Sequence, residues 1–312
     1  MKKEYPLVSV ITPTYKRPDS LPRAIDSVLN QSYPNVEIIV VDDNNPGTEG
    51  RQKTEIIMAS YANNPRVKYI KHDINKNGAA ARNTGVRNSK ARYVGFLDDD
   101  DEFLPQKIES QVNLLEHLSE EWGVCYSKAF TKKTNSSYIL RGENRQGYLF
   151  LESLTRNLGL LAGSNLLLRR SAFESINGFD ETFRRNQDVE FTTRLLQKYK
   201  IAYCDTPGLI VYIHNEHKYY KALDVDKQYC EQFANLVNSL DEKDRQFFFK
   251  ELSKQMFFSA LRSDKNYNYC LNAIIKHLIP YRETLIYIYR RMKKSIKPPV
   301  TYPDIESILK DN

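Results

Sequence analysis

Four consecutive aspartates stand where an apolar segment ends. Asp98–Asp101 directly follows the run Tyr-Val-Gly-Phe-Leu at residues 93–97. Carboxylates crowded at the end of a buried strand repel one another unless a cation joins them, and Mg²⁺ and Mn²⁺ favour such oxygen ligands. In an extended segment Asp98 and Asp100 would face one way and Asp99 the other. The alternative is a solvated acidic turn that caps the following helix.

Polar residues also follow two other apolar or turn-bounded segments. Asp42 and Asp43 end the run of residues 36–41, although the sequence that follows them is also ordinary turn chemistry. The segment Asn77–Asn83 opens a helix with small residues, so that backbone could approach a ligand and Arg82 could face an anionic group. An ordinary glycine-containing loop explains this second segment equally well.

Two single residues could handle a proton or a metal ion. Asp188 opens an amphipathic helical segment and could act as a general base, or it could simply cap the helix. His214 ends the apolar run of residues 209–213 and could bind a metal ion, or it could form a structural hydrogen bond. The sequence has neither a defensible Ser/His/Asp or Cys/His spacing nor a phosphate loop of the GxxxxGK type.

The elements that must position these residues alternate along the first hundred residues. Short β-branched runs and helical patterns follow one another, which is typical of βα units that feed a mostly parallel sheet. We predict strands over residues 7–12, 36–42, 67–71 and 93–97, and helices over residues 19–31, 48–61 and 79–88. Ligands of such sheets bind beyond the carboxyl ends of the strands, where the polar residues stand.

The rest of the chain is less regular and then becomes helical. We predict helices over residues 106–118 and 188–198, and strands over residues 124–130, 165–169, 201–204 and 209–214. From about residue 222 helical patterns follow one another without strands, which predicts a domain boundary near residue 220. The expected organisation is a catalytic domain over residues 1–220, with halves 1–105 and 106–220, and a helical C-terminal region over residues 221–312.

Most of the net charge of +7 lies in residues 276–297. This placement argues against a broad nucleic-acid-binding face, so no nucleic-acid partner is expected. Within it, residues 281–294 combine an apolar face with arginines and lysines, which suits either a helix on an anionic membrane surface or a helix packed on the catalytic domain. No segment approaches the roughly 20 apolar residues that span a bilayer. We expect a cytoplasmic protein that at most attaches to the inner face of the plasma membrane.

Taken in order, these residues resemble glycosyltransferase family 2. The matching segments are Val8–Tyr15, Val40–Asp43, Asn77–Asn83, Phe96–Asp101, Asn177–Asp180 and Gln187–Arg194. Each segment is unspecific by itself, whereas the ordered series is specific. The resemblance implies an α/β fold of the GT-A (Rossmann-like) type: a mostly parallel sheet flanked by helices, here with an α-helical C-terminal extension.

The resemblance also implies nucleotide contacts at four positions. Pro13 and Tyr15 would touch the nucleotide, with the tyrosine ring near the base. Asp43 would accept a hydrogen bond from the base, and Arg82 would lie toward the diphosphate or the base.

The same resemblance gives the acidic segment and Asp188 their roles. Asp98–Asp100 is similar to the family's DxD motif, in which Asp98 and Asp99 would face the nucleotide sugar, and Asp100 would hold a Mn²⁺ or Mg²⁺ ion that bridges the phosphates. Asp188 matches the catalytic base, although the acid that often precedes it is Gln187 here. His214 aligns with a position that supplies a further metal ligand in some members.

The implied reaction is an inverting transfer of a hexosyl or N-acetylhexosaminyl group. The donor would be a nucleotide-diphosphate sugar, expected to be UDP-linked, and the acceptor a hydroxyl of a glycan or lipid-linked molecule in the synthesis of bacterial cell-surface polysaccharide or glycoconjugate. One alternative is a nucleotidyltransferase, but Thr12–Arg17 lacks the glycines of its usual loop. The other is a noncatalytic sugar-nucleotide-binding subunit, against which the presence of both Asp100 and Asp188 argues.

Overall fold

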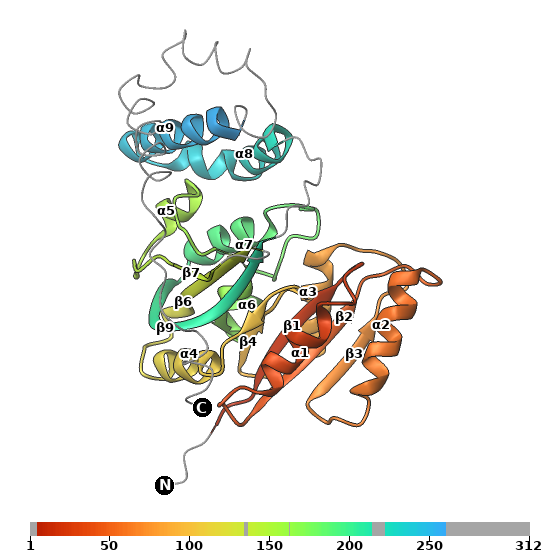
Figure 1. Ribbon diagram of the computed structural model, residues 1–312. Coiled ribbons are helices and arrows are strands. Elements are labelled where there is room, and N and C mark those ends of the chain that lie inside the picture. Colours follow the sequence, from red (N-terminus) through yellow and green to blue (C-terminus); the bar gives the residue numbers. More distant parts are fainter. Residues whose placement is uncertain (1–4, 134–136, 162, 214–221, 260–312) are drawn as a thin grey trace. The chain divides into compact units, whose positions relative to one another are not determined.

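The computed structural model describes residues 5–133, 137–161, 163–213 and 222–259 (Figure 1). The described residues form two compact units, the first from residues 5–150 and 159–213, and the second from residues 151–158 and 222–259. His214 and the basic segment 276–297, with its predicted amphipathic helix, lie outside the described residues.

The first unit is built on a mixed sheet. Its described strands are β1 (Val8–Thr14), β2 (Val36–Asp42), β3 (Val67–Lys71), β4 (Tyr93–Phe96), β5 (Glu102–Phe103), β6 (Trp122–Lys133), β7 (Ile139–Arg141), β8 (Leu167–Arg169) and β9 (Lys200–Ile213). They lie in the order β3-β2-β1-β4-β8-β6-β9-β5, and β7 pairs with β6. The first four strands are parallel to one another, which places all their carboxyl ends at one edge. The predicted α/β class is thereby confirmed.

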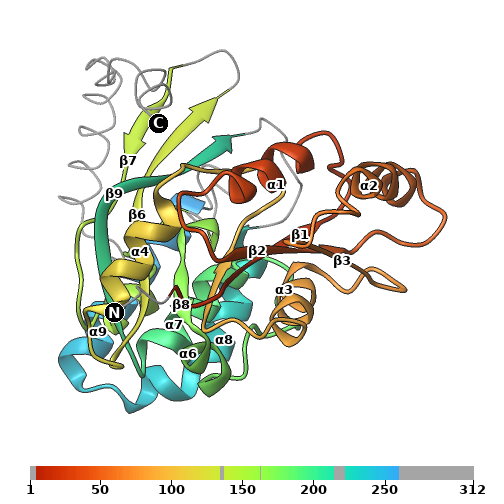
Figure 2. The same cartoon turned by 90° about the horizontal axis from the view of Figure 1, so that it is seen from below.

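Helices cover both faces of the parallel strands. The described helices of this unit are α1 (Leu21–Leu29), α2 (Glu49–Ser60), α3 (Gly78–Arg87), α4 (Lys107–Glu116), α6 (Arg170–Ser175) and α7 (Gln187–Leu196), with a 3₁₀ turn η1 (Gly163–Asn165). Helices α1 and α2 lie on one face of β1–β3 and α3 on the other (Figure 2). Because β2 is covered on both faces, all seven of its residues are buried.

Local sequence explains why these helices lie as they do. In α1 the buried residues Leu21, Ala24, Ile25 and Val28 recur at helical spacing and face the sheet. In α3, Gly85 allows close approach to β1, because a methyl group there would lie 2.2 Å from Cγ2 of Ile11. The helix that carries Arg82 therefore packs tightly on the strand that leads to Pro13.

The prediction of two separate strands over residues 201–204 and 209–214 is wrong. One strand, β9, runs over Lys200–Ile213 and pairs in parallel with β6 along its length. The residues Asp205–Gly208, which lie between the two predicted strands, are accommodated by register shifts between Ser127 and Ala129 of β6. A bulge of this kind adds residues to one strand without ending the pairing.

The second unit packs two long helices around a short segment. Its helices are α8 (Ala222–Ser239) and α9 (Glu242–Ser259), and α5 (Phe150–Leu154) bridges the boundary in sequence. Tyr229 is buried and donates a hydrogen bond to the carbonyl of Leu154 at 3.1 Å, while its ring lies 4.8 Å from that of Phe233. None of the helices in the described ranges is long and apolar enough to cross a membrane.

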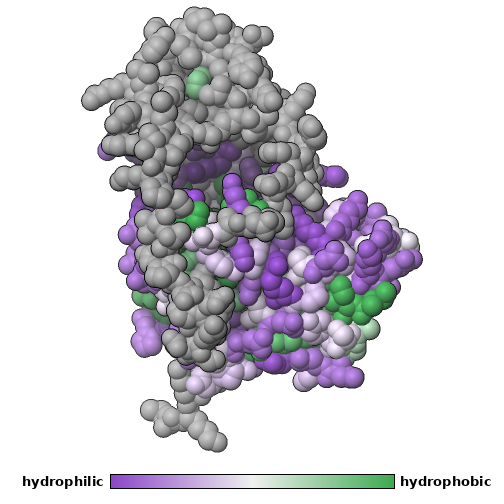
Figure 3. All heavy atoms as spheres, in the orientation of Figure 1, coloured by the Kyte–Doolittle hydropathy of each residue, from purple (hydrophilic) through white to green (hydrophobic). Residues whose placement is uncertain are grey.

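The surface offers few apolar patches on the side seen in Figure 3, where hydrophilic residues predominate among those described. Single exposed apolar residues such as Ile56 and Ile74 are ordinary for a folded protein. The polar groups at the carboxyl edge of the sheet are therefore the candidates for a functional site.

Lys107, in the first turn of α4, is fully buried. Its ammonium donates to the carbonyl and side-chain oxygens of Asn165, at 3.1 and 3.4 Å. Burial lowers the pKa of this ammonium to about 8. Both oxygens of Asn165 have a second donor, from Gln111 and Ser127 respectively, so removing the lysine would leave neither unsatisfied.

We predict that Lys107→Met is at least as stable as the wild type at pH 7. The folded-state pKa of about 8 lies below the ordinary 10.5, so the cost of burying the charge is full below pH 8 and disappears as pH rises toward 10.5. That cost is on the order of 3 kcal/mol. Urea unfolding of both proteins at pH 7 and pH 10 should show a variant advantage that shrinks with pH. A variant clearly less stable at pH 7 would contradict the interpretation.

Candidate active site

The acidic loop that follows β4 brings three carboxylates together. Oxygen atoms of Asp98, Asp100 and Asp101 lie within 4.8 Å of one another. Asp101 is buried and accepts hydrogen bonds from the hydroxyl of Ser164 at 2.7 Å and the backbone N–H of Tyr212 at 3.3 Å. Burial raises the pKa of Asp101, and the charges of Asp98 and Asp100 raise it further. The cluster is thus a grouping of hard oxygen ligands of the type that binds Mg²⁺ or Mn²⁺.

Asp99 turns away from this cluster toward the end of β1. Its carboxylate accepts hydrogen bonds from the hydroxyl of Thr14 at 2.9 Å and the N–H of Tyr15 at 3.3 Å. Burial raises the pKa of Asp99 to about 7, Asp100 adds to the shift, and Arg17 opposes it. Asp99 therefore holds the segment of Pro13 and Tyr15 against the acidic loop.

Two arginines of the β1–α1 region support the same loop. Arg17 forms ion pairs with Asp99 and Asp100. Arg23 donates to the backbone carbonyl of Asp100 at 2.6 Å, and its guanidinium lies 3.8 Å from the ring centre of Tyr212. Sequence reasoning missed Arg17, although its position two residues after Tyr15 at the end of a strand was a usable signal.

The two residues expected to meet the nucleotide from β1 lie where they can reach a ligand. Pro13 is partly buried in β1, and the residue Tyr15, just beyond the strand, is 37% exposed. The ammonium of Lys16 lies 5.0 Å from the centre of that ring. An exposed ring held by its backbone to Asp99 offers a flat face to a nucleobase.

Asp43 occupies a different position from the acidic loop. It is buried after β2, and each of its carboxylate oxygens has two partners. One oxygen meets His72 Nδ1 at 2.8 Å and the N–H of Lys76 at 2.7 Å, and the other accepts from Asn75 and Asn77. Since a carboxylate offers about four acceptor sites, a hydrogen bond from a base would have to share or displace one of these.

Arg82 links two segments that are far apart in sequence. Its guanidinium forms an ion pair with Asp98 and donates to the side-chain oxygen of Gln187 at 3.0 Å. Its Nε is buried and has no hydrogen-bond partner among the described residues. Because Arg82 also lines the cavity beside the acidic cluster, its guanidinium is placed to meet an anionic group of a bound ligand.

The neighbouring Asn83 clamps the loop that precedes α7. Its side-chain amide donates to the carbonyl of Phe179 and accepts from the N–H of Phe179, both at 2.9 Å. Asn177 and Gly178, at φ values of 58° and 68°, make the turn before this clamp. The ring of Phe179 stacks on that of Phe191 in α7 at 4.1 Å. These contacts fix the start of α7 next to the helix that carries Arg82.

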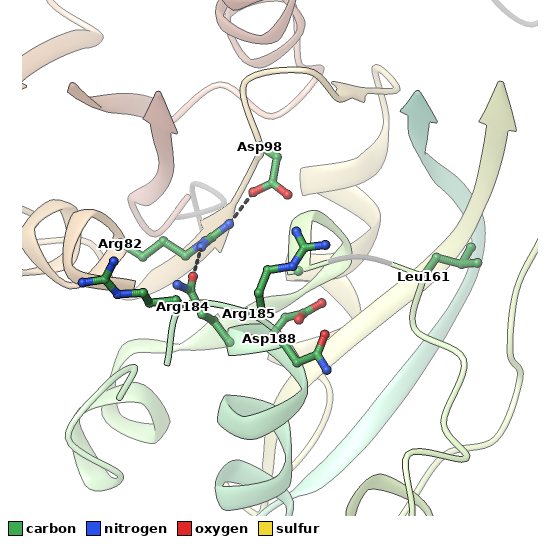
Figure 4. Close-up of a pocket in the computed structure, with 9 residues that line it drawn as sticks. Arg82, Asp98, Leu161, Arg184, Arg185 and Asp188 are labelled. Carbon is green, nitrogen blue, oxygen red and sulfur yellow. Dashed lines mark hydrogen bonds and ion pairs between the residues drawn. The ribbon is translucent and has the colours of Figure 1, made fainter. Parts of the chain in front are cut away.

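Asp188 borders a cavity of about 300 Å³ at the start of α7. Figure 4 shows Asp98 on one side of the cavity and Asp188 on the other, with Arg82 and Arg185 extending into the space between them. Burial raises the pKa of Asp188 and so does Asp98, while Arg82 and two backbone N–H groups lower it. The cavity is lined by Arg82, Asp98, Leu161, Gly163, Arg184, Arg185, Asn186, Gln187 and Asp188.

Three other acids near Asp188 in sequence are engaged elsewhere. Glu190 is buried and forms an ion pair with Arg194 in the same helix. Asp180 accepts from the N–H and hydroxyl of Thr182, at 2.9 and 2.7 Å. Glu181 accepts from the amide of Asn83 at 2.9 Å. Of these four acids, all of which the structure describes, only Asp188 lines the cavity.

The structure therefore brings together most of the residues singled out in the sequence. Asp98, Arg82 and Asp188 border one cavity, and Asp99 and Asp100 belong to the same loop as Asp98. Sequence reasoning missed Arg184 and Arg185, which line the cavity from an irregular loop that carries no periodic signal. Asp101 was part of the acidic run but had no assigned role.

The order and direction of the strands, with helices on both faces, are those of the GT-A fold. The chain belongs to glycosyl transferase family 2, whose sequence profile matches residues 9–176.

Two sequence relatives and one solved structure resemble this chain, the structure in its fold. An uncharacterized glycosyltransferase of Rickettsia bellii (strain RML369-C) is 32% identical over 197 residues, which are 62% of this chain and 28% of that protein. The amylovoran biosynthesis glycosyltransferase AmsB of Erwinia amylovora is 28% identical over 196 residues, 60% of this chain and 62% of AmsB. The crystal structure of S. aureus TarS 1–349 in complex with UDP-GlcNAc matches with a TM-score of 0.63 at 16% identity, over 88% of this chain and 82% of that chain. The chain thus spans less than a third of the Rickettsia bellii relative.

Proposed function

We propose that this protein transfers a sugar, with inversion, from a UDP-linked donor to a hydroxyl of a glycan or lipid-linked acceptor, in the synthesis of cell-surface polysaccharide or glycoconjugate. The observation that carries the proposal is the meeting of Asp188 and the acidic loop at one cavity. A base on one side and a site for the leaving diphosphate on the other are what an inverting displacement requires.

The donor side is supported by the chemistry of the acidic loop. Asp100, with Asp98 and Asp101 close by, would hold Mn²⁺ or Mg²⁺, and His214 is a further candidate ligand outside the described residues. When bound, such an ion neutralises charge that develops on a leaving diphosphate. The guanidinium of Arg82, which lines the cavity, would face the diphosphate, and Pro13 and Tyr15 would contact the nucleoside.

The acceptor side is supported by Asp188. The acceptor oxygen would attack the anomeric carbon, the bond from that carbon to the diphosphate oxygen would break, and the acceptor proton would pass to the Asp188 carboxylate. A carboxylate whose pKa is raised by burial is a stronger base than an exposed one. One displacement from the face opposite the diphosphate inverts the anomeric configuration.

Two of the comparisons support the donor and the pathway class. TarS has been crystallised with UDP-GlcNAc, which favours a uridine nucleotide for a chain of the same fold. The name of AmsB refers to the biosynthesis of amylovoran. A lipid-linked acceptor agrees with the basic segment 276–297, which lies outside the described residues.

The proposal is tested by thermal shift with a panel of nucleotide sugars, each with and without Mn²⁺. A ligand that binds the native state raises the apparent melting temperature, and at one hundred times its Kd the gain is about 2.7 kcal/mol. We expect the largest shift for a UDP-sugar with Mn²⁺, followed by slow release of free sugar and UDP from that donor. Binding without sugar release would favour a noncatalytic subunit, and release of pyrophosphate from a nucleoside triphosphate would favour a nucleotidyltransferase.

A further inference from the structure

The turn η1 is joined to the acidic loop by the buried hydroxyl of Ser164. The N–H of Asp98 donates to Oγ of Ser164 at 3.0 Å, and that hydroxyl donates to Oδ2 of Asp101 at 2.7 Å. Ser164 is fully buried. Its hydroxyl therefore holds both ends of the acidic loop, the first through backbone and the last through a carboxylate oxygen.

The residue before it contacts the other side of the cavity. Gly163 lines the cavity, and a methyl group at this position would lie 3.3 Å from Cβ of Asp188. That separation is tighter than ordinary van der Waals contact. The absence of a side chain at Gly163 thus allows Asp188 to lie directly against the turn.

The residue after it fastens the turn to the rest of the unit. Asn165 is buried, and its amide donates to the carbonyl of Ser127 in β6 at 2.7 Å. Its side-chain oxygen accepts from the N–H of Ser127 at 3.1 Å, and its carbonyl accepts from Lys107 in α4 at 3.1 Å. Because the turn is fixed to a strand and a helix, a side chain added at Gly163 must displace Asp188 rather than the turn.

We propose that the Gly163–Asn165 turn is a positioning element, in which Gly163 sets the place of Asp188 and Ser164 sets the geometry of the acidic loop. The inference rests on the proposed function, since it assigns Asp188 to proton transfer and the loop to metal binding. Although adjacent, Gly163 and Ser164 act on different steps: Gly163 on proton transfer through Asp188, and Ser164 on metal binding through the acidic loop.

For Gly163 the test is Gly163→Ala, with Gly159→Ala as the matched control because a methyl group at Gly159 would meet nothing within 4 Å. We expect Gly163→Ala to lower kcat for sugar transfer by about threefold to tenfold, since the methyl group would shift Asp188 by a few tenths of an ångström and a shift of about 1 Å in a reacting group costs roughly 10²-fold. Binding of UDP with Mn²⁺ should stay within twofold of the wild type. Equal kcat values for Gly163→Ala and Gly159→Ala would overturn this half of the proposal.

For Ser164 the test is Ser164→Ala, with Ser89→Ala as the matched control. Ser89 is also buried, and its hydroxyl accepts from the N–H of Ala91 at 3.0 Å and donates to Ser9 at 2.7 Å. Both variants lose two comparable hydrogen bonds, so their melting temperatures should fall similarly. Only Ser164→Ala should weaken Mn²⁺ binding, by about tenfold, which is the usual effect of losing a residue that supports metal ligands.

The outcomes separate this inference from the proposed function. Electron paramagnetic resonance measures Mn²⁺ binding without donor or acceptor. The claim about Ser164 can therefore be tested even if the protein transfers no sugar. Equal Mn²⁺ binding by Ser164→Ala and Ser89→Ala would overturn it. If Ser164→Ala does not fold, Ser164→Cys, which keeps the volume but weakens both hydrogen bonds, is compared with Ser89→Cys in the same Mn²⁺ measurement. Wild-type protein that binds Mn²⁺ but releases no sugar from any donor would instead count against the proposed function.

Discussion

Asp188→Asn is expected to lower sugar transfer by about two to four orders of magnitude, the usual cost of removing a general base. The amide has nearly the volume of the carboxylate but cannot accept the acceptor's proton. Asp188 lies across the cavity from the loop that would hold the diphosphate, so binding of UDP with Mn²⁺ should stay near the wild-type value. Initial rates and isothermal titration with UDP measure the two effects.

The matched control for this variant is Asp180→Asn. Asp180 lies a few residues earlier, is partly exposed, bonds to Thr182 and does not line the cavity. Its loss should leave the transfer rate within a few fold of the wild type. A large loss of transfer rate in Asp180→Asn with little loss in Asp188→Asn would assign the role of base to Asp180. Weakened UDP binding and a lowered melting temperature in Asp188→Asn would instead show that Asp188 is a helix cap.

The pH dependence of transfer gives the same residue a second test. Asp188 must be ionised to accept a proton, so the rate should fall as pH drops through its pKa, which burial places above that of an ordinary aspartate. In Asp188→Asn this acid limb should vanish from the residual rate. An unchanged acid limb in the variant would show that another group produces it.

The sequence predicted the parallel half of the sheet well, for a physical reason. Strands β1, β2 and β4 are buried on both faces, so they read as continuous apolar runs that end sharply at polar residues. The ends of those runs predicted where Thr14, Asp42 and the acidic loop would lie. Local pattern and final environment agree there, and the element boundaries fall within a few residues of expectation.

The second half of the sheet was harder to predict because its elements are short or interrupted. Strand β5 has two residues and β7 three, too few for an alternating pattern. In β9 the turn-like Asp205–Gly208 lies inside a strand, since pairing with β6 continues on both sides of it. Long-range pairing overrode the local turn signal.

Some residues of the candidate site could be recognised from local sequence, whereas others are recognised only from contacts with distant parts of the chain. Asp98–Asp101 and Asp188 stand out by residue type and position. The roles of Arg17, Arg185 and Ser164 depend on contacts across long sequence separations, such as that between Ser164 and Asp101. For Asp43 the family resemblance implies a contact with the base, and the fold adds four internal partners of its carboxylate that the sequence did not predict.

Asp100→Asn should abolish most metal-dependent nucleotide binding while the protein remains folded. A neutral amide is a weaker ligand for a hard cation than a carboxylate, and it nearly conserves volume. The fold should tolerate the change, because Asp98 and Asp101 lie close by and removing one of three neighbouring negative charges reduces their repulsion. Arg17 keeps Asp99 as an ion-pair partner.

The expected loss of Mn²⁺ affinity can be estimated from metal sites in other proteins. Loss of a residue that merely supports metal ligands weakens binding about 10- to 100-fold, so loss of a ligand should weaken Mn²⁺ binding by at least about tenfold. UDP affinity measured with Mn²⁺ should then fall to the value measured with chelator. Asp205→Asn is the control, because Asp205 is exposed and pairs with Lys128 in the second half of the sheet. If Asp100→Asn binds Mn²⁺ and UDP with the same affinities as Asp205→Asn, Asp100 is excluded as the metal ligand. Asp98 and Asp101 would then be the remaining carboxylates of the cluster.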